Sequence, residues 1–177
     1  MRCSTLVACG IVLLLPVAAF PASAQARRSC PVAETGEVVL YGDVGSPITL
    51  TEADLLALPQ ASVRETPHGG EPSDFSGPRL EDVLASANLP RGPQLRGNEV
   101  TRYVVVEAVD GYRALFALAE LDGAFRVETP ILALRRNGTA LDGESGPFQV
   151  IVPGEMRHAR WVRQVACIRI AQDEAAR

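Results

Sequence analysis

The sequence predicts an α+β fold with a mixed or antiparallel β-sheet and two or three short helices. About seven or eight segments have the composition of strands, whereas only two or three have apolar residues at helical spacing. The helical segments do not alternate with the strands, which argues against a doubly wound parallel sheet. No internal repeat or low-complexity block interrupts the 177 residues, so these elements are expected to form one domain.

The strands are predicted from apolar and β-branched runs bounded by turn residues. Their expected positions are 37–41, 48–50, 61–66, 101–108, 112–118, 131–135, 148–152 and 162–170. Asp110-Gly111 predicts a tight turn that makes a hairpin of its two flanking strands, and Asn137-Gly138 is a type I′ hairpin signal. The polar segment 153–160 is expected to be a loop before the last strand.

Two helices can be placed with their ends. Residues 52–58 follow Thr51, a good N-cap, have an acidic first turn and stop at Pro59. Residues 79–87 carry Leu80, Val83, Leu84 and Ala87 at helical spacing, which predicts an amphipathic helix.

The N-terminus has the pattern of a cleavable signal peptide. Arg2 precedes an apolar run from Leu6 to Phe20, and Ala22 and Ala24 supply the small residues of an A-x-A cleavage site. The run of about 15 residues is shorter than the roughly 20 that a membrane span requires. We therefore expect residues 1–24 to be removed, and the mature protein to be periplasmic or secreted without inserting into a membrane.

Three further boundaries follow from composition. Residues 25–35 form a polar lead-in, residues 36–171 form the folded domain, and residues 172–177 form a short tail. A mature chain of about 153 residues is long enough to bury about 70% of its unfolded surface.

The charge of the chain argues against nucleic acid as a partner. It has 17 basic residues, all arginine, against 21 acidic residues, and a formal net charge of −4. Phosphate contacts need a basic footprint, which a net acidic chain does not supply.

Two cysteines, Cys30 and Cys167, remain after the expected cleavage. In an exported protein their simplest interpretation is a disulfide that ties the first segment to the last strand. Two free thiols or a metal-binding pair are the alternatives, but two cysteines and two histidines at scattered spacing do not make a zinc site.

No motif for catalysis is present. The sequence lacks a Gly-x-Ser-x-Gly elbow, a phosphate-binding loop and a zinc-binding histidine pair. The two histidines, His68 and His158, lie in segments expected to be loops, where a histidine is more often a solvated surface residue. We therefore predict no catalytic and no metal-ligating residue.

The densest group of unusual residues is Arg157-His158-Ala159-Arg160-Trp161-Val162-Arg163. In a strand that starts near Trp161, Trp161 and Arg163 would share one face. An aromatic ring beside guanidinium groups suits a planar heterocycle with an anionic or hydroxylated tail. The alternative is a solvated arginine edge next to a tryptophan that packs on the core.

Several segments, taken together in their order and spacing, resemble the molybdopterin-binding domain of the sulfite oxidase family. They are Leu80 to Leu84, Val104 to Ala108 with Asp110-Gly111-Tyr112, Ile131 to Leu134, Gly138 with Leu141, Gly146 to Gly154, and Ala159 to Arg163. The last segment is similar to the one with which that family holds the phosphate of its pterin cofactor. The resemblance covers residues 36–171 and implies a sulfite oxidase-like fold.

One departure from that family concerns the metal. Its oxidases bind molybdenum through a cysteine in the first half of the domain, whereas Ser62 to His68 contain none. A thiolate is the kind of ligand that a soft metal centre needs, so molybdenum is not expected here. The chain is more similar to short, exported members of the fold, some of which bind a reduced pterin without metal and signal to a membrane-bound cyclic-di-GMP regulator.

The resemblance therefore implies a non-catalytic periplasmic protein that binds a reduced pterin or molybdopterin and acts on the periplasmic domain of a membrane signalling protein. In this hypothesis Trp161 stacks on the pterin ring and three arginines contact its polar tail. The predicted pterin-binding residues are Trp161, Arg160, Arg157, Arg163, Thr66, His68 and Tyr112. The alternatives are a molybdenum-cofactor oxidoreductase with an atypical metal site, and an interaction domain that has lost its ligand.

Overall fold

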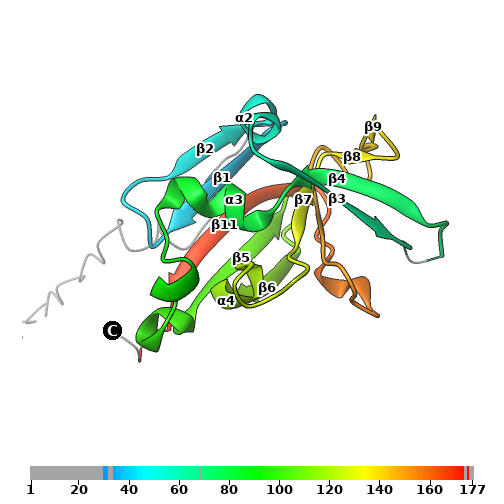
Figure 1. Ribbon diagram of the computed structural model, residues 1–177. Helices are drawn as coiled ribbons and strands as arrows, with labels where there is room; N and C mark the ends of the chain where they lie inside the picture. Colours follow the sequence, from blue (N-terminus) through cyan, green and yellow to red (C-terminus); the bar gives the residue numbers. More distant parts are fainter. Residues whose placement is uncertain (1–29, 32–33, 68, 174, 176–177) are drawn as a thin grey trace, which may run out of the picture.

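The computed structural model describes residues 30–31, 34–67, 69–173 and 175. Its main element is a five-stranded sheet with the order β2-β1-β11-β5-β6. These strands are β1 (Glu37–Gly42), β2 (Ile48–Thr51), β5 (Arg102–Ala108), β6 (Arg113–Ala117) and β11 (Val165–Gln172). Neighbouring strands are antiparallel except β1 and β11, which are parallel. The last strand, β11, thus lies between β1 and the hairpin of β5 and β6 (Figure 1).

Two smaller sheets complete the β structure. One has the order β3-β4-β8-β9, and the other pairs β7 with β10 in an antiparallel arrangement. Their strands are β3 (Gln60–Glu65), β4 (Ser73–Pro78), β7 (Ile131–Ala133), β8 (Arg135–Arg136), β9 (Thr139–Ala140) and β10 (Gln149–Ile151). In Figure 1, β3 and β4 form a hairpin that extends away from the five-stranded sheet. The α+β class with mixed sheets, predicted from the sequence, is thus confirmed.

The helices are short. They are α2 (Glu52–Ala57), α3 (Leu80–Val83) and α4 (Leu118–Leu121), with 3-10 turns η1 (Leu84–Ala87), η2 (Gly92–Gln94), η3 (Gly97–Thr101) and η4 (His158–Arg160). Thr51 caps α2 as predicted, because its side chain accepts a hydrogen bond from Asp54 N and the Asp54 carboxylate accepts one from the Thr51 backbone N–H.

Two predicted elements need correction. The single helix expected over 79–87 becomes one α-helical turn followed by η1, which ends at Asn88 with a left-handed φ of 52°. The last strand starts at Val165 and not near Trp161, because η4 and the irregular residues after it occupy the expected beginning. Between them Gln164 has a φ of 49°, which no regular strand contains.

The main hydrophobic core lies on one face of the five-stranded sheet. Side chains alternate along β1, so Val38 and Leu40 point into this core while Val39 and Tyr41 point to the opposite face. The core face is covered by elements that include α3 and the β7–β10 pair, and Ile131, Leu132 and Val150 are fully buried there.

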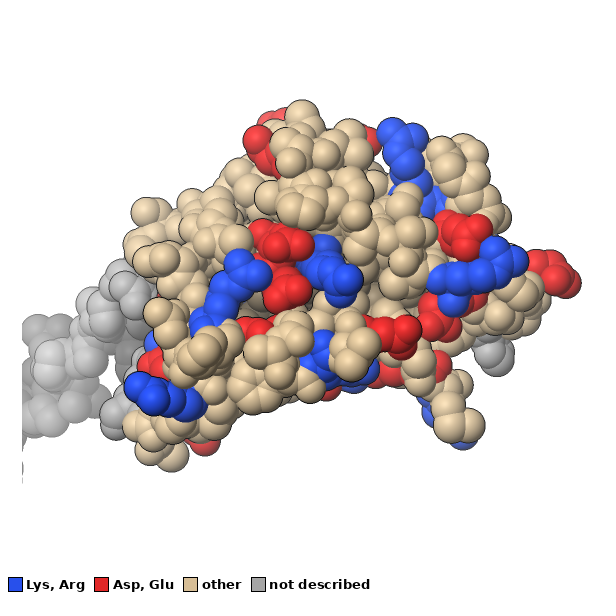
Figure 2. All heavy atoms as spheres, in the orientation of Figure 1, with Lys and Arg blue, Asp and Glu red and all other residues tan. Residues whose placement is uncertain are grey.

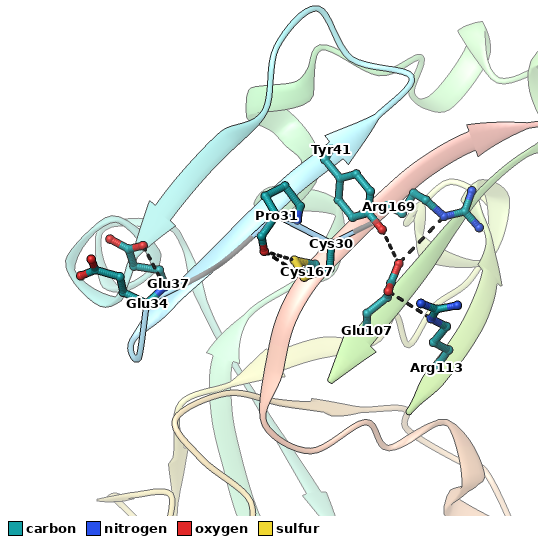
Figure 3. Close-up of a disulfide and its surroundings, with 9 residues drawn as sticks. All are labelled: Cys30, Pro31, Glu34, Glu37, Tyr41, Glu107, Arg113, Cys167 and Arg169. Carbon is teal, nitrogen blue, oxygen red and sulfur yellow. Dashed lines mark hydrogen bonds and ion pairs between the residues drawn. A yellow bond between two sulfur atoms is a disulfide. The ribbon is translucent and has the colours of Figure 1, made fainter. Parts of the chain in front are cut away.

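The opposite face of the sheet carries a disulfide between Cys30 and Cys167 (Figure 3). The two Cα atoms are 5.8 Å apart and the cysteines are separated by 137 positions. Cys167 is fully buried in a small cluster with Val39, Tyr41 and Ala166. The disulfide therefore ties the N-terminal segment to the last strand, the arrangement expected from the sequence.

Next to the disulfide, the same face holds a buried carboxylate. Glu107 is 3% exposed, and it accepts hydrogen bonds from the Tyr41 hydroxyl and from Arg113 Nε at 3.0 Å. Arg169 Nε lies 3.9 Å from Oε1 of Glu107, the oxygen that accepts from Tyr41 (Figure 3). Burial and the hydrogen bond to Glu107 raise the pKa of Tyr41 above its ordinary value of 10.0.

We expect Tyr41→Phe to lower stability at neutral pH by about 1–3 kcal/mol, because a hydrogen bond to a buried carboxylate is lost. The raised pKa means that the contribution of neutral Tyr41 is present below pH 10 and is lost as the pH rises further, since the unfolded chain ionises first. The difference between the wild type and the variant in urea unfolding curves should therefore be constant below about pH 10 and should narrow as the pH rises above that value. A difference that is independent of pH would contradict this assignment.

Candidate functional site

The predicted ligand-binding segment is the loop that joins β10 to β11, and it packs across the edge of β6. The Tyr112 hydroxyl donates a hydrogen bond to the carbonyl oxygen of Ala159. Arg160 Nη1 lies 3.5 Å from the carbonyl oxygen of Leu115 in β6. The loop and the start of β6 therefore form one continuous surface.

The end of β3 reaches the same surface from the other side. The backbone N–H of Gly154 donates to Glu65 Oε1 at 2.9 Å, and this bond joins the loop to the last residue of β3. Gly154 has a φ of 74°, a left-handed conformation that glycine adopts without a steric penalty. Thr66, the next residue after Glu65, is exposed on this surface, while His68 lies outside the described residues.

Trp161 is part of the core of this region. Its side chain is 8% exposed, its ring meets Phe75 edge-on at 5.8 Å, and its Nε1–H donates to the Val152 carbonyl at 3.2 Å. The His158 imidazole is stacked on it at 3.8 Å with an angle of 17° between the planes. Because the strand begins only at Val165, the predicted alternation of Trp161 and Arg163 on one strand face is wrong.

Arg160 is held by two carboxylates. Its Nε donates to Glu155 Oε1 at 2.7 Å, and its Nη1 donates to Glu120 Oε1 at 3.0 Å. The guanidinium carbon also lies 4.6 Å from the centre of the Phe116 ring. Partial burial lowers the pKa of Arg160, but the hydrogen bonds with Glu155 and Glu120 outweigh it and the net shift is upward. Arg160 thus fastens the loop to α4 and β6.

Arg157 and Arg163 differ from Arg160 in both exposure and partners. Both are exposed, and neither makes a hydrogen bond or ion pair within the described part of the chain. On the face shown in Figure 2, arginines are interspersed with acidic side chains and form no continuous basic area. The loop therefore presents two exposed guanidinium groups without a hydrogen bond or ion pair among the described residues, as Arg96 and Arg135 do elsewhere. Such groups are suited to binding an anion.

The structure thus brings together most of the residues predicted from the sequence. Arg157, Arg160 and Arg163 belong to the loop, and Trp161 lies beneath it. Tyr112 donates a hydrogen bond to the loop, and Thr66 follows Glu65, which accepts one from it. The carboxylates of Glu65, Glu120 and Glu155, which position the loop, were not predicted. The partners of Glu65 and Glu120 are 89 and 40 positions away, so nothing in their local sequence indicates these roles. Glu155 lies only five positions from Arg160, and this pairing within the loop was missed.

A cleft of about 450 Å³ is lined by other residues, among them Gln164, the residue that follows Arg163. Its walls include Glu37, Val109, Leu141, Gly143 and Gln164. This volume is in the range of small-molecule sites. None of the predicted pterin-binding residues that the structure describes lines this cleft.

The chemistry available at the loop is that of binding. Among the residues that the structure describes, no group of three or more His, Cys, Asp and Glu side chains could hold a metal ion. The loop offers exposed guanidinium groups, a half-buried imidazole and the Tyr112 ring. These groups suit a planar ligand with a negatively charged substituent.

Comparison with known proteins supports the fold and the family. A family model described as the oxidoreductase molybdopterin binding domain matches residues 71–176, which is more than half of the chain. Among solved structures, the sulfane dehydrogenase SoxCD from Paracoccus pantotrophus is similar, with a TM-score of 0.59 and 19% sequence identity. The similarity covers 76% of this chain but only 37% of that one. The search of curated proteins finds no match.

Proposed function

Because the chain belongs to the oxidoreductase molybdopterin-binding domain family, we propose that it is an exported protein that binds a reduced pterin without molybdenum. It would carry out no redox reaction of its own, and would pass the presence of its ligand to the periplasmic part of a membrane signalling protein.

The observation that carries this proposal is the state of the cysteines. Cys30 and Cys167 form a disulfide on the face of the sheet opposite the main core, and the sequence has no cysteine between them. A thiolate ligand for molybdenum is therefore not provided by the folded domain, whereas a pterin with an anionic tail needs only the guanidinium and aromatic groups of the loop. The residues suit the organic part of the cofactor and not its metal.

Among the described residues, no helix has the length and apolar character needed to cross a membrane. The support for export comes from the disulfide, because disulfides persist mainly in oxidising compartments outside the cytoplasm. Tyr112, Leu115 and Met156 are 49%, 55% and 99% exposed beside the loop, so a partner could contact the ligand and apolar surface together.

The proposal predicts that the purified protein carries pterin without molybdenum. The full chain should be expressed in bacteria that make molybdopterin, and pterin fluorescence and molybdenum content should be measured on the same denatured sample. We expect about one pterin per chain and less than about a tenth of an equivalent of molybdenum, because the thiolate ligand is missing.

Two other results would contradict the proposal, and each would indicate a different function. Stoichiometric molybdenum with pterin would identify a molybdenum-dependent oxidoreductase with an atypical metal site. Neither group, together with no binding of added dihydropterin, would indicate an interaction domain that has lost its ligand. A host unable to make molybdopterin separates molybdopterin from simpler pterins, since only the latter would then remain bound.

A further inference from the structure

The surface of Trp161 that a ligand ring would need is already occupied. The His158 imidazole lies 3.8 Å from the Trp161 ring and within 17° of parallel. Only 8% of Trp161 remains exposed, whereas His158 is partly exposed. A planar ligand approaching from solvent therefore meets the imidazole before it meets the indole.

Trp161 is also fixed on its other sides. Its Nε1–H is bonded to the Val152 carbonyl, and the edge-to-face contact with Phe75 places the indole in the main core. Turning the indole towards a ligand would break this buried hydrogen bond and open the core. Trp161 is thus a rigid support for the imidazole.

His158 has the properties of a side chain that contacts a ligand. Its imidazole makes no hydrogen bond within the described residues, so both ring nitrogens are available. The turn that carries it is anchored two residues later by Arg160 through Glu155 and Glu120. On its other side, Arg157 is exposed and without an ion-pair partner among the described residues.

We propose that His158, supported by Trp161, is the side chain on which the ring of the ligand stacks. The ligand class is a planar nitrogen heterocycle with an oxyanion on its side chain, the oxyanion lying near Arg157. This inference rests on the proposed function, since it assigns the residue that contacts the pterin. It replaces Trp161 by His158 as the stacking residue.

The test compares the wild type with three variants by titration calorimetry with dihydroneopterin and dihydroneopterin monophosphate. His158→Ala should weaken binding of both ligands about 5- to 150-fold, the range that corresponds to loss of one aromatic stacking partner. His158→Phe keeps a ring face and should stay within about threefold of the wild type. Gly143→Leu is the control for the cleft, because Gly143 lines the cleft and a side chain there has open space around its Cβ.

The possible outcomes distinguish a failure of the proposed function from a failure of the role given to His158. No binding by the wild type contradicts both the proposed function and this inference. Binding that His158→Ala leaves unchanged or strengthens contradicts only the role of His158, the second result indicating that the imidazole blocks Trp161. Binding lost in Gly143→Leu and kept in His158→Ala would place the ligand in the cleft and overturn the inference.

Discussion

Opening the disulfide between Cys30 and Cys167 should lower the free energy of unfolding by about 5 kcal/mol in the chain-entropy model. The bond closes a loop between cysteines 137 positions apart, which includes almost the whole folded domain. The unfolded chain consequently gains much conformational freedom when the bond is removed. A domain of this size is typically stable by only 5–15 kcal/mol, so the reduced protein should be close to its folding limit at 37 °C.

Urea unfolding of the oxidised protein, the reduced protein and Cys30→Ala would measure this effect. The Cys30→Ala variant is the better comparison, because Cys167 is fully buried and substituting it would also change the packing around Tyr41 and Val39. Reduction and Cys30→Ala should lower the urea midpoint by similar amounts and should raise the slope m, as the unfolded state expands. Unchanged midpoints in both would contradict a stabilising cross-link.

Local sequence signals were sufficient for much of the fold. Thr51 caps a helix through contacts with a residue three positions away, so the whole interaction is contained in a few residues. Asn137 and Gly138 both have positive φ, 50° and 78°, and form the predicted turn between β8 and β9. Such elements depend on neighbours in the chain, which a single sequence displays.

The site depended on contacts that no local pattern contains. Arg160 was predicted to bind ligand because it is one of three similar arginines, but Glu120, 40 positions away, holds it. Trp161 was expected at the start of a strand, yet η4 turns the chain and places the indole against Phe75, 86 positions earlier. The arginines of the loop have the same side-chain chemistry, and their different roles come from contacts with residues on other elements. The spacing of residues along one segment does not show those contacts.

The difference between the arginines leads to the prediction with the largest effect on binding. Replacing both Arg157 and Arg163 by glutamine should weaken binding of dihydroneopterin monophosphate about 100-fold or more, since each charge-assisted hydrogen bond contributes about 1.5–3 kcal/mol. Binding of dihydroneopterin, which lacks the phosphate, should change less than about fivefold. Because both side chains are exposed and unpaired in the described structure, stability should stay within about 0.5 kcal/mol of the wild type.

Two single variants are the controls for this experiment. Arg160→Gln leaves Glu155 and Glu120 without their shared partner, so it should lower stability by about 1–2 kcal/mol and should not selectively affect the phosphorylated ligand. Arg96→Gln removes another exposed arginine, in the loop before η3, and should change neither property. In the wild type, the preference for dihydroneopterin monophosphate over dihydroneopterin should also fall as the salt concentration rises. If Arg160→Gln abolished that preference while the double variant kept it, the anion would bind at the carboxylate-held guanidinium, and Arg157 and Arg163 would have no role in recognition.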